Sequence, residues 1–239
     1  MAVKSRFLID LRVGPRTLAS AIALVTSVAM CCTKGAIPLL LADDHPPYRN
    51  AILQVFGWIQ HGRRRRRRGR KKRPRLKAPA GLQVGIVKKV RDAKGNLVKV
   101  TRKALHGRVV EIERLIRKLG IGTRINTSHM ERLNGTIRTQ QQGRMGRRSR
   151  NVSRVTRLLE YALWLWRDLY NWHRVHGSLH GRTPAMALGL ATEVWTVLRY
   201  VSHPVHVSDL QRQEWAEMRN SLAESALDVY ERKKALPFL

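Results

Sequence analysis

The chain has 239 residues, 43% of them hydrophobic, which is enough for one large domain or one domain with appendages. Lysine and arginine total 47 against 16 acidic residues, giving a formal net charge of +31. So large a positive charge needs a polyanionic partner, for which nucleic acid is the first candidate and a membrane surface the alternative.

The N-terminal quarter is expected to form a strand, a helix, a second strand and a second helix. Residues 6–13 alternate bulky and polar side chains, which favours a strand. Thr17 is suited to cap a helix that runs to about residue 32, and residues 37–42 (IPLLLA) are typical of a buried parallel strand. This order predicts a right-handed βαβ unit, followed by a helix over residues 48–59.

Asp43 and Asp44 come directly after the second of these strands. Carboxylates at the C-terminal end of a buried strand stand where α/β folds place their chemistry. Both residues are equally suited to a plain turn before the next helix, whose N-terminus a carboxylate stabilises. The residues alone leave the two roles open.

Residues 18–41 are rich in apolar side chains, so a membrane span has to be considered. Lys34 and Gly35 interrupt the run, and its uninterrupted part is shorter than the roughly 20 residues that a span needs. No membrane helix is therefore expected. Cys31 and Cys32 are adjacent, so they form neither a disulfide framework nor a zinc site, which indicates a reducing compartment.

Residues 61–80 are expected to form a disordered, solvated insertion. Twelve of the fifteen residues from Arg63 to Lys77 are arginine or lysine, and like charges at this density repel one another. The insertion is predicted to bind phosphates, although the same run also has the composition of a nuclear localisation signal. The candidate DNA-binding residues within it are Arg63, Arg64, Arg65, Arg66, Arg67, Arg68, Arg70, Lys71, Lys72 and Arg73.

The middle of the chain predicts a hairpin and a helix. Residues 81–90 and 97–105 have the composition of strands, and residues 92–96 form a turn between them. Residues 107–119 predict an amphipathic helix that Gly120 ends.

The segment INTSHMERLNGTIR, residues 125–138, predicts another helix. Its apolar residues recur at helical spacing, whereas Glu131, Asn134 and Arg138 share a different face. Ser128 suits the N-cap position. Ser128-x-x-Glu131 is also a capping box, in which Glu131 would only satisfy backbone N–H groups.

The C-terminal part is predicted to be helical. A long helix over residues 153–171 has a wide apolar face, on which the tryptophan and tyrosine side chains are expected to be core residues rather than platforms for stacked bases. Thr183-Pro184 predicts a capped helix that runs to about residue 200. Residues 205–239 are more acidic and predict a helical tail that folds back or dimerises.

Three segments, in order, resemble prokaryotic insertion-sequence transposases of the DDE class, of the IS1 type. The first is FLIDLRVGPRT, from Phe7. The second is ADDHPPYRNA, where the family has an aspartate followed five residues later by tyrosine, a spacing that matches Asp43 and Tyr48. The third joins NTSHMERLNGTIR to YNWHRVHGSLHGRTPAMAL, in which Val175 stands where the family usually has proline.

The resemblance implies a ribonuclease-H-like core and an enzyme that cuts and joins DNA. Asp43 and Glu131 then correspond to two of the family's three metal-binding carboxylates, which hold two Mg²⁺ or Mn²⁺ ions in an in-line displacement at a phosphodiester. Arg132, Arg138 and Arg174 join the basic insertion as DNA-binding candidates. The implied partners are the DNA of the element ends and target and possible further copies of the chain, with no membrane and no small-molecule substrate, in the nucleoid of a prokaryotic cytoplasm.

The family's first catalytic aspartate lies upstream of the segment that matches Phe7, so this sequence is expected to be an N-terminally truncated copy that is inactive alone. Asp10 is not assigned as the missing ligand. The expected fold is an incomplete α/β ribonuclease-H-like core, a mixed sheet flanked by helices, formed by residues 1–60 and 81–200. The alternative function is a non-catalytic, basic nucleic-acid-binding protein.

Overall fold

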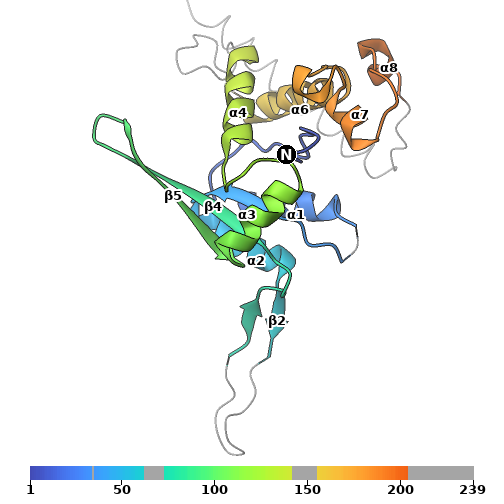
Figure 1. The fold of residues 1–239 in the computed structure, drawn as a ribbon. Coiled ribbons are helices and arrows are strands. Elements are labelled where there is room, and N and C mark those ends of the chain that lie inside the picture. The colour runs from blue at the N-terminus through green and yellow to red at the C-terminus, as the bar shows by residue number, and fades with distance from the viewer. Residues whose placement is uncertain (34, 62–72, 142–154, 204–239) are drawn as a thin grey trace, which may run out of the picture. The chain divides into compact units, whose positions relative to one another are not determined.

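The computed structural model describes residues 1–33, 35–61, 73–141 and 155–203 (Figure 1). The chain divides into two compact units, Met1–Trp195 and Thr196–Leu239. In the second unit the described residues form one short helix, α8 (Val197–Val201). The expected tail helix and most of the basic insertion lie outside the described residues, including Arg63 to Arg68, Arg70, Lys71 and Lys72.

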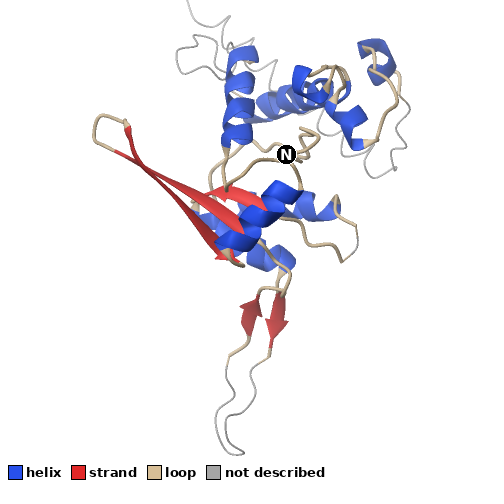
Figure 2. Ribbon diagram, in the orientation of Figure 1, coloured by secondary structure: helices blue, strands red, loops and turns tan. Residues whose placement is uncertain are grey.

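The first unit contains a three-stranded mixed sheet in the order β1-β4-β5 (Figure 2). Strand β1 (Leu40–Asp43) runs parallel to β4 (Val84–Arg91), and β4 pairs antiparallel with β5 (Leu97–His106). A separate two-stranded sheet pairs β2 (Trp58–Gln60) with β3 (Arg75–Lys77).

Helices cover both faces of the main sheet. Successive side chains of a strand point to opposite faces, so β4 offers apolar side chains to both layers. Val84 and Ile86 of β4 pack against α1 (Leu18–Met30) and α2 (Pro46–Phe56) in one hydrophobic cluster. Val87 points to the opposite face and packs against α3 (Val109–Lys118). The sheet is therefore the middle layer of an α/β arrangement, as the sequence predicts at this coarser level.

A third cluster joins the N-terminal segment to α4 (Ser128–Gln140) and α6 (Thr156–Trp172). Its buried members are Leu8, Leu133, Ile137, Leu163, Trp166 and Tyr170. The short helices η1 (Gly177–Leu179) and α7 (Pro184–Leu188) follow α6.

The predicted strand over residues 6–13 is wrong. This segment contains no strand, and several of its backbone polar groups bond to side chains instead of to a neighbouring strand. The Leu8 backbone pairs with the buried amide of Asn171, and the Leu11 carbonyl accepts from the Trp164 indole. The βαβ unit therefore lacks its first strand in the described part of the chain.

Several local predictions are confirmed. Thr17 Oγ1 accepts a hydrogen bond from the Ser20 amide and caps α1, and Asp92 Oδ1 accepts from the Asn96 amide in the hairpin turn. The helix expected from Thr183 to about residue 200 is wrong in length, because Gly189 takes a left-handed conformation (φ 81°) and ends α7. No helix among the described residues is long and apolar enough to cross a membrane.

Candidate functional site

Asp43 is the last residue of β1, at the end of the sheet where its parallel neighbour β4 continues. Its Cα pairs with that of Val87, and its side chain is 58% exposed. The Arg16 guanidinium lies 4.0 Å from the carboxylate. Asp43 is thus available to a ligand from solvent.

Glu131 lies in the first turn of α4 and is about half exposed. Its Oε1 accepts a hydrogen bond from Thr127 Oγ1 at 2.6 Å and pairs with Lys89 Nζ. Two hydrogen bonds lower the pKa of the Glu131 carboxyl. The one from Lys89 has the larger effect, and the one from Thr127 is second. Glu131 is therefore an ionised acceptor at neutral pH.

Asp43 and Glu131 both neighbour strand β4. Lys89, which binds Glu131, lies on β4 two residues beyond Val87, the partner of Asp43. Residues two apart share a face, and strand spacing puts the Cα atoms of Asp43 and Lys89 about 8 Å apart. The last residue of β1 and the first turn of α4 thus both flank this part of β4, although Asp43 and Glu131 are far apart in sequence.

Asp44 has a different role. Its Oδ1 accepts a hydrogen bond from Arg49 of α2 at 2.6 Å. That bond lowers the pKa of the Asp44 carboxyl, and the charges of Lys88 and Lys103 add to the effect. The turn role that the sequence left open therefore fits Asp44, which fastens the start of α2.

The capping box predicted for Ser128 and Glu131 is wrong. The N-cap position is Thr127, and Ser128 bonds to Asn126 Oδ1 through both its amide and its hydroxyl. Glu131 contributes to this helix start only through the Thr127 hydroxyl.

Asp10 lies away from this region, packed between α1 and α6. Its carboxylate accepts from Ser27 Oγ at 2.6 Å and Arg12 Nε at 2.9 Å, with Arg167 at 4.0 Å. These contacts make it a structural residue. The described residues include no cluster of three or more His, Cys, Asp or Glu side chains suited to a metal ion.

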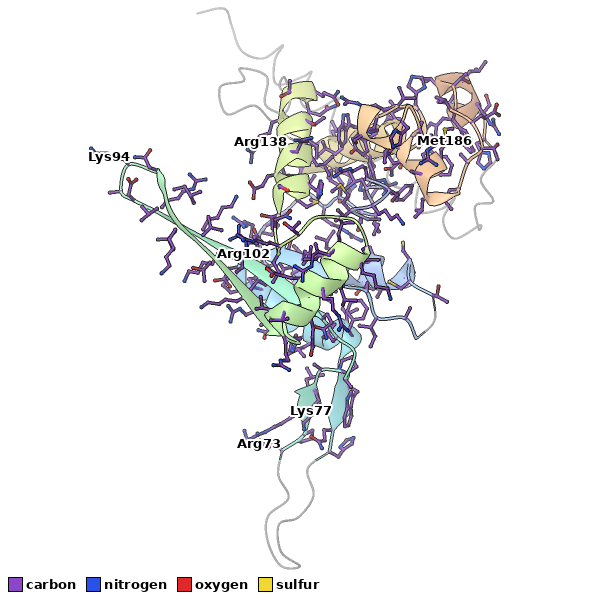
Figure 3. All side chains as sticks on the ribbon, viewed as in Figure 1. Arg73, Lys77, Lys94, Arg102, Arg138 and Met186 are labelled. Carbon is purple, nitrogen blue, oxygen red and sulfur yellow. The ribbon has the colours of Figure 1, made fainter. Side chains whose placement is uncertain are left out.

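The arginines predicted to bind DNA are dispersed. Arg73 is exposed just before β3, and Arg132 and Arg138 are exposed on α4 (Figure 3). Arg174 is partly buried just beyond α6, and its Nη1 has no hydrogen-bond partner among the described residues. Trp166 and Tyr170 are buried and stacked on each other at 5.1 Å between ring centroids, as core residues.

A basic surface on β4 and β5 escaped the sequence analysis. Figure 1 shows the two strands continuing past the helices as a ribbon, with Lys94 in the turn at its tip (Figure 3). In the antiparallel register, Lys88 faces Thr101, Val90 faces Lys99 and Ile86 faces Lys103. Directly opposed residues share a face, so one side of the ribbon carries three exposed lysines at steps of about 7 Å, namely Lys88, Lys99 and Lys103. The alternating lysines of β5 could have indicated this surface from the sequence. The register that places Lys88 beside them could not be read from the sequence.

The chain matches no family model, and neither the curated proteins nor the solved structures include a significant match. The site therefore has to be interpreted from its own residues and geometry.

Replacing Lys89 by methionine is expected to raise the pKa of Glu131 toward that of an ordinary glutamate, because Lys89 is the largest cause of its depression. A depressed carboxyl pKa stabilises the fold above the ordinary glutamate value, and that contribution is lost as the pH falls through the depressed pKa. The free energy of unfolding of the variant should therefore fall less steeply as the pH is lowered into the acid range. NMR titration of the Glu131 carboxyl measures the shift, with Lys94→Met as the control; an unchanged pKa would contradict the ion pair.

Proposed function

We propose that this chain is a DNA-binding protein of DNA transposition, with a core of the ribonuclease-H-like DDE type. In this proposal Asp43 and Glu131 hold a divalent cation against the DNA backbone. The lysines of the β4–β5 ribbon and the arginines of α4 bind the surrounding phosphates.

The observation that carries the proposal is that Asp43 and Glu131 both neighbour strand β4, Asp43 at Val87 and Glu131 at Lys89. The two residues come from separate segments, and Lys89 lies between their surroundings. Both carboxylates are about half exposed, and each has a cationic side chain nearby. A bound metal ion would replace those cations as the counter-charge.

The residues present fit one hard cation but not two. Mg²⁺ in proteins is commonly held by one or two carboxylates, water molecules and substrate phosphates. Asp43, Glu131 and a DNA phosphate would make such a set. A two-ion site needs further carboxylates, and the neighbouring Asp44 is paired with Arg49, while the described residues hold no cluster of three or more metal-binding side chains. We therefore derive no cleavage step and expect the isolated chain to bind DNA without cutting it.

Electrostatics supports DNA as the partner. The three lysines on one side of the ribbon repeat about every 7 Å, and an antiparallel two-stranded ribbon fits the major groove of B-DNA, which is about 12 Å wide. Exposed apolar side chains near the tip, Val90, Leu97 and Val98, would lie against the sugars and base edges. The lysine contacts to phosphates would position the protein on the duplex largely independently of sequence.

The DNA-binding half of the proposal is tested by equilibrium binding to a short duplex at increasing salt. Six or more phosphate contacts would lower the affinity by about 10³-fold or more between about 50 and 200 mM salt. An affinity that does not change over this range would contradict binding through the phosphate backbone.

A non-catalytic nucleic-acid-binding protein is the second candidate. It is favoured by the Lys89 ammonium, which already neutralises Glu131. Mn²⁺ binding distinguishes the two candidates. The first requires that the chain bind Mn²⁺ through both Asp43 and Glu131, and the second requires no Mn²⁺ binding.

A further inference from the structure

Four basic side chains converge where the N-terminal segment crosses the ends of α4 and α6. They are Arg6, His129, Arg174 and His176. The Leu8 amide donates to Asn171 Oδ1 at 2.9 Å, and Asn171 Nδ2 donates to the Leu8 carbonyl at 3.0 Å. This buried clamp brings Arg6 to the end of α6.

Each member of the group is held by a local contact. Arg6 Nη1 donates to His129 Nδ1 on α4. The His176 ring packs edge-on against Tyr170, with 4.8 Å between the ring centroids. The backbone of His176 is fixed by a bridge to Arg182. The group is therefore ordered by the fold.

The charges that act on this group are all positive. Burial lowers the pKa of His176, and the charges of Arg174 and Arg6 lower it further. Clustered positive charges without a counter-ion destabilise a fold, whereas a bound anion would relieve the repulsion.

Two nitrogen atoms in the group are buried and unsatisfied. Arg174 Nη1 and His176 Nε2 have no hydrogen-bond partner among the described residues. Leaving a buried polar group unpaired is costly, and the cost is greater for a charged one. Arg174 and Tyr170 also line an open hollow of about 440 Å³ at the end of α6, within the size range of ligand sites.

We infer that Arg6, Arg174 and His176 form a phosphate-binding site, in which Arg174 Nη1 and His176 Nε2 donate to the phosphate oxygens and His129 positions Arg6. Arginine suits this role because its planar guanidinium matches phosphate oxygens. The phosphate group is one of the DNA backbone, an assignment that rests on the proposed function. A free phosphate or nucleotide would offer the same chemistry.

The site is tested by thermal unfolding of the full chain in inorganic phosphate and in chloride at equal ionic strength. Phosphate at about five times its Kd should raise the Tm of the unmodified chain by about 2–4 °C. Arg174→Gln should lose that rise, and its Tm in chloride should be equal or higher, because one of the clustered charges is removed. Arg174→Lys should retain part of the rise, and Arg114→Gln, which removes an exposed charge from α3, should retain all of it.

An equal rise for Arg174→Gln, or no rise for the unmodified chain, would overturn the phosphate site. An equal fall in the Tm of Arg174→Gln in both salts, with the phosphate effect intact, would assign Arg174 to packing instead.

The source of the phosphate is tested with a DNA duplex. If the DNA backbone supplies it, Arg174→Gln should reduce the slope of log affinity against log salt by about one unit. An unchanged slope together with a retained phosphate effect would leave the site intact and refute the DNA assignment alone. Failure of the unmodified chain to bind any duplex would refute the proposed function without affecting the thermal result.

Discussion

Replacing Asn171 by alanine is expected to lower the free energy of unfolding by about 2–5 kcal/mol. Asn171 is 1% exposed, and its amide both accepts from and donates to the backbone of Leu8. The variant leaves a buried N–H and a buried C=O unpaired, each of which costs about 1–3 kcal/mol. The N-terminal segment has no strand to pair with, so this clamp is its main polar attachment to α6.

Chemical denaturation of the full chain measures the effect. The control is Asn96→Ala, which removes the hydrogen bond from Asn96 Nδ2 to Asp92 Oδ2 in an exposed turn, where water can replace it. We expect the control to lose much less stability than Asn171→Ala. Equal losses of unfolding free energy in the two variants would show that the buried clamp contributes no more to stability than an exposed hydrogen bond.

Replacing Lys88, Lys99 and Lys103 together by glutamine is expected to weaken duplex DNA binding by about 10²–10³-fold at about 0.1 M salt. Each phosphate contact contributes about tenfold at this salt concentration through counterion release. The three side chains are exposed and share one side of the ribbon, so a single duplex can contact all of them. The slope of log affinity against log salt should fall by about three units.

The control is the triple variant Lys4→Gln, Arg114→Gln and Lys118→Gln, which removes the same charge from exposed positions outside the ribbon. Its affinity should fall much less. Equal losses would mean that net charge, and not the ribbon, determines DNA binding.

The secondary structure that follows from local patterns was predictable. The hairpin and α3 follow from alternation and helical periodicity, and the Thr17 cap marks the start of α1. The structure of residues 6–13 was not predictable. An alternating pattern specifies an extended chain but not the neighbour with which that chain pairs. Asn171, more than 160 positions away in the sequence, pairs with the Leu8 backbone in place of a neighbouring strand.

The candidate site was predictable only in part. Asp43 and Glu131 were identified from a family resemblance, but their positions beside β4 depend on the parallel register of β1 with β4 and on Lys89. The resemblance also favoured Asp43 over Asp44, and the pairing of Asp44 with Arg49 agrees with that choice. Of the cationic group around Arg6 and His176, the resemblance indicated Arg174 alone, because three separate segments supply the group.

The central claim is that Asp43 and Glu131 share one cation site, and Mn²⁺ binding to the full chain, followed by electron paramagnetic resonance with and without duplex DNA, tests it most directly. We expect one bound ion whose affinity increases with DNA and falls steeply in both Asp43→Asn and Glu131→Gln. Asp44→Asn should bind Mn²⁺ like the unmodified chain, because Arg49 occupies that carboxylate. Mn²⁺ binding that survives both substitutions, or that responds to only one of them, would contradict a shared site.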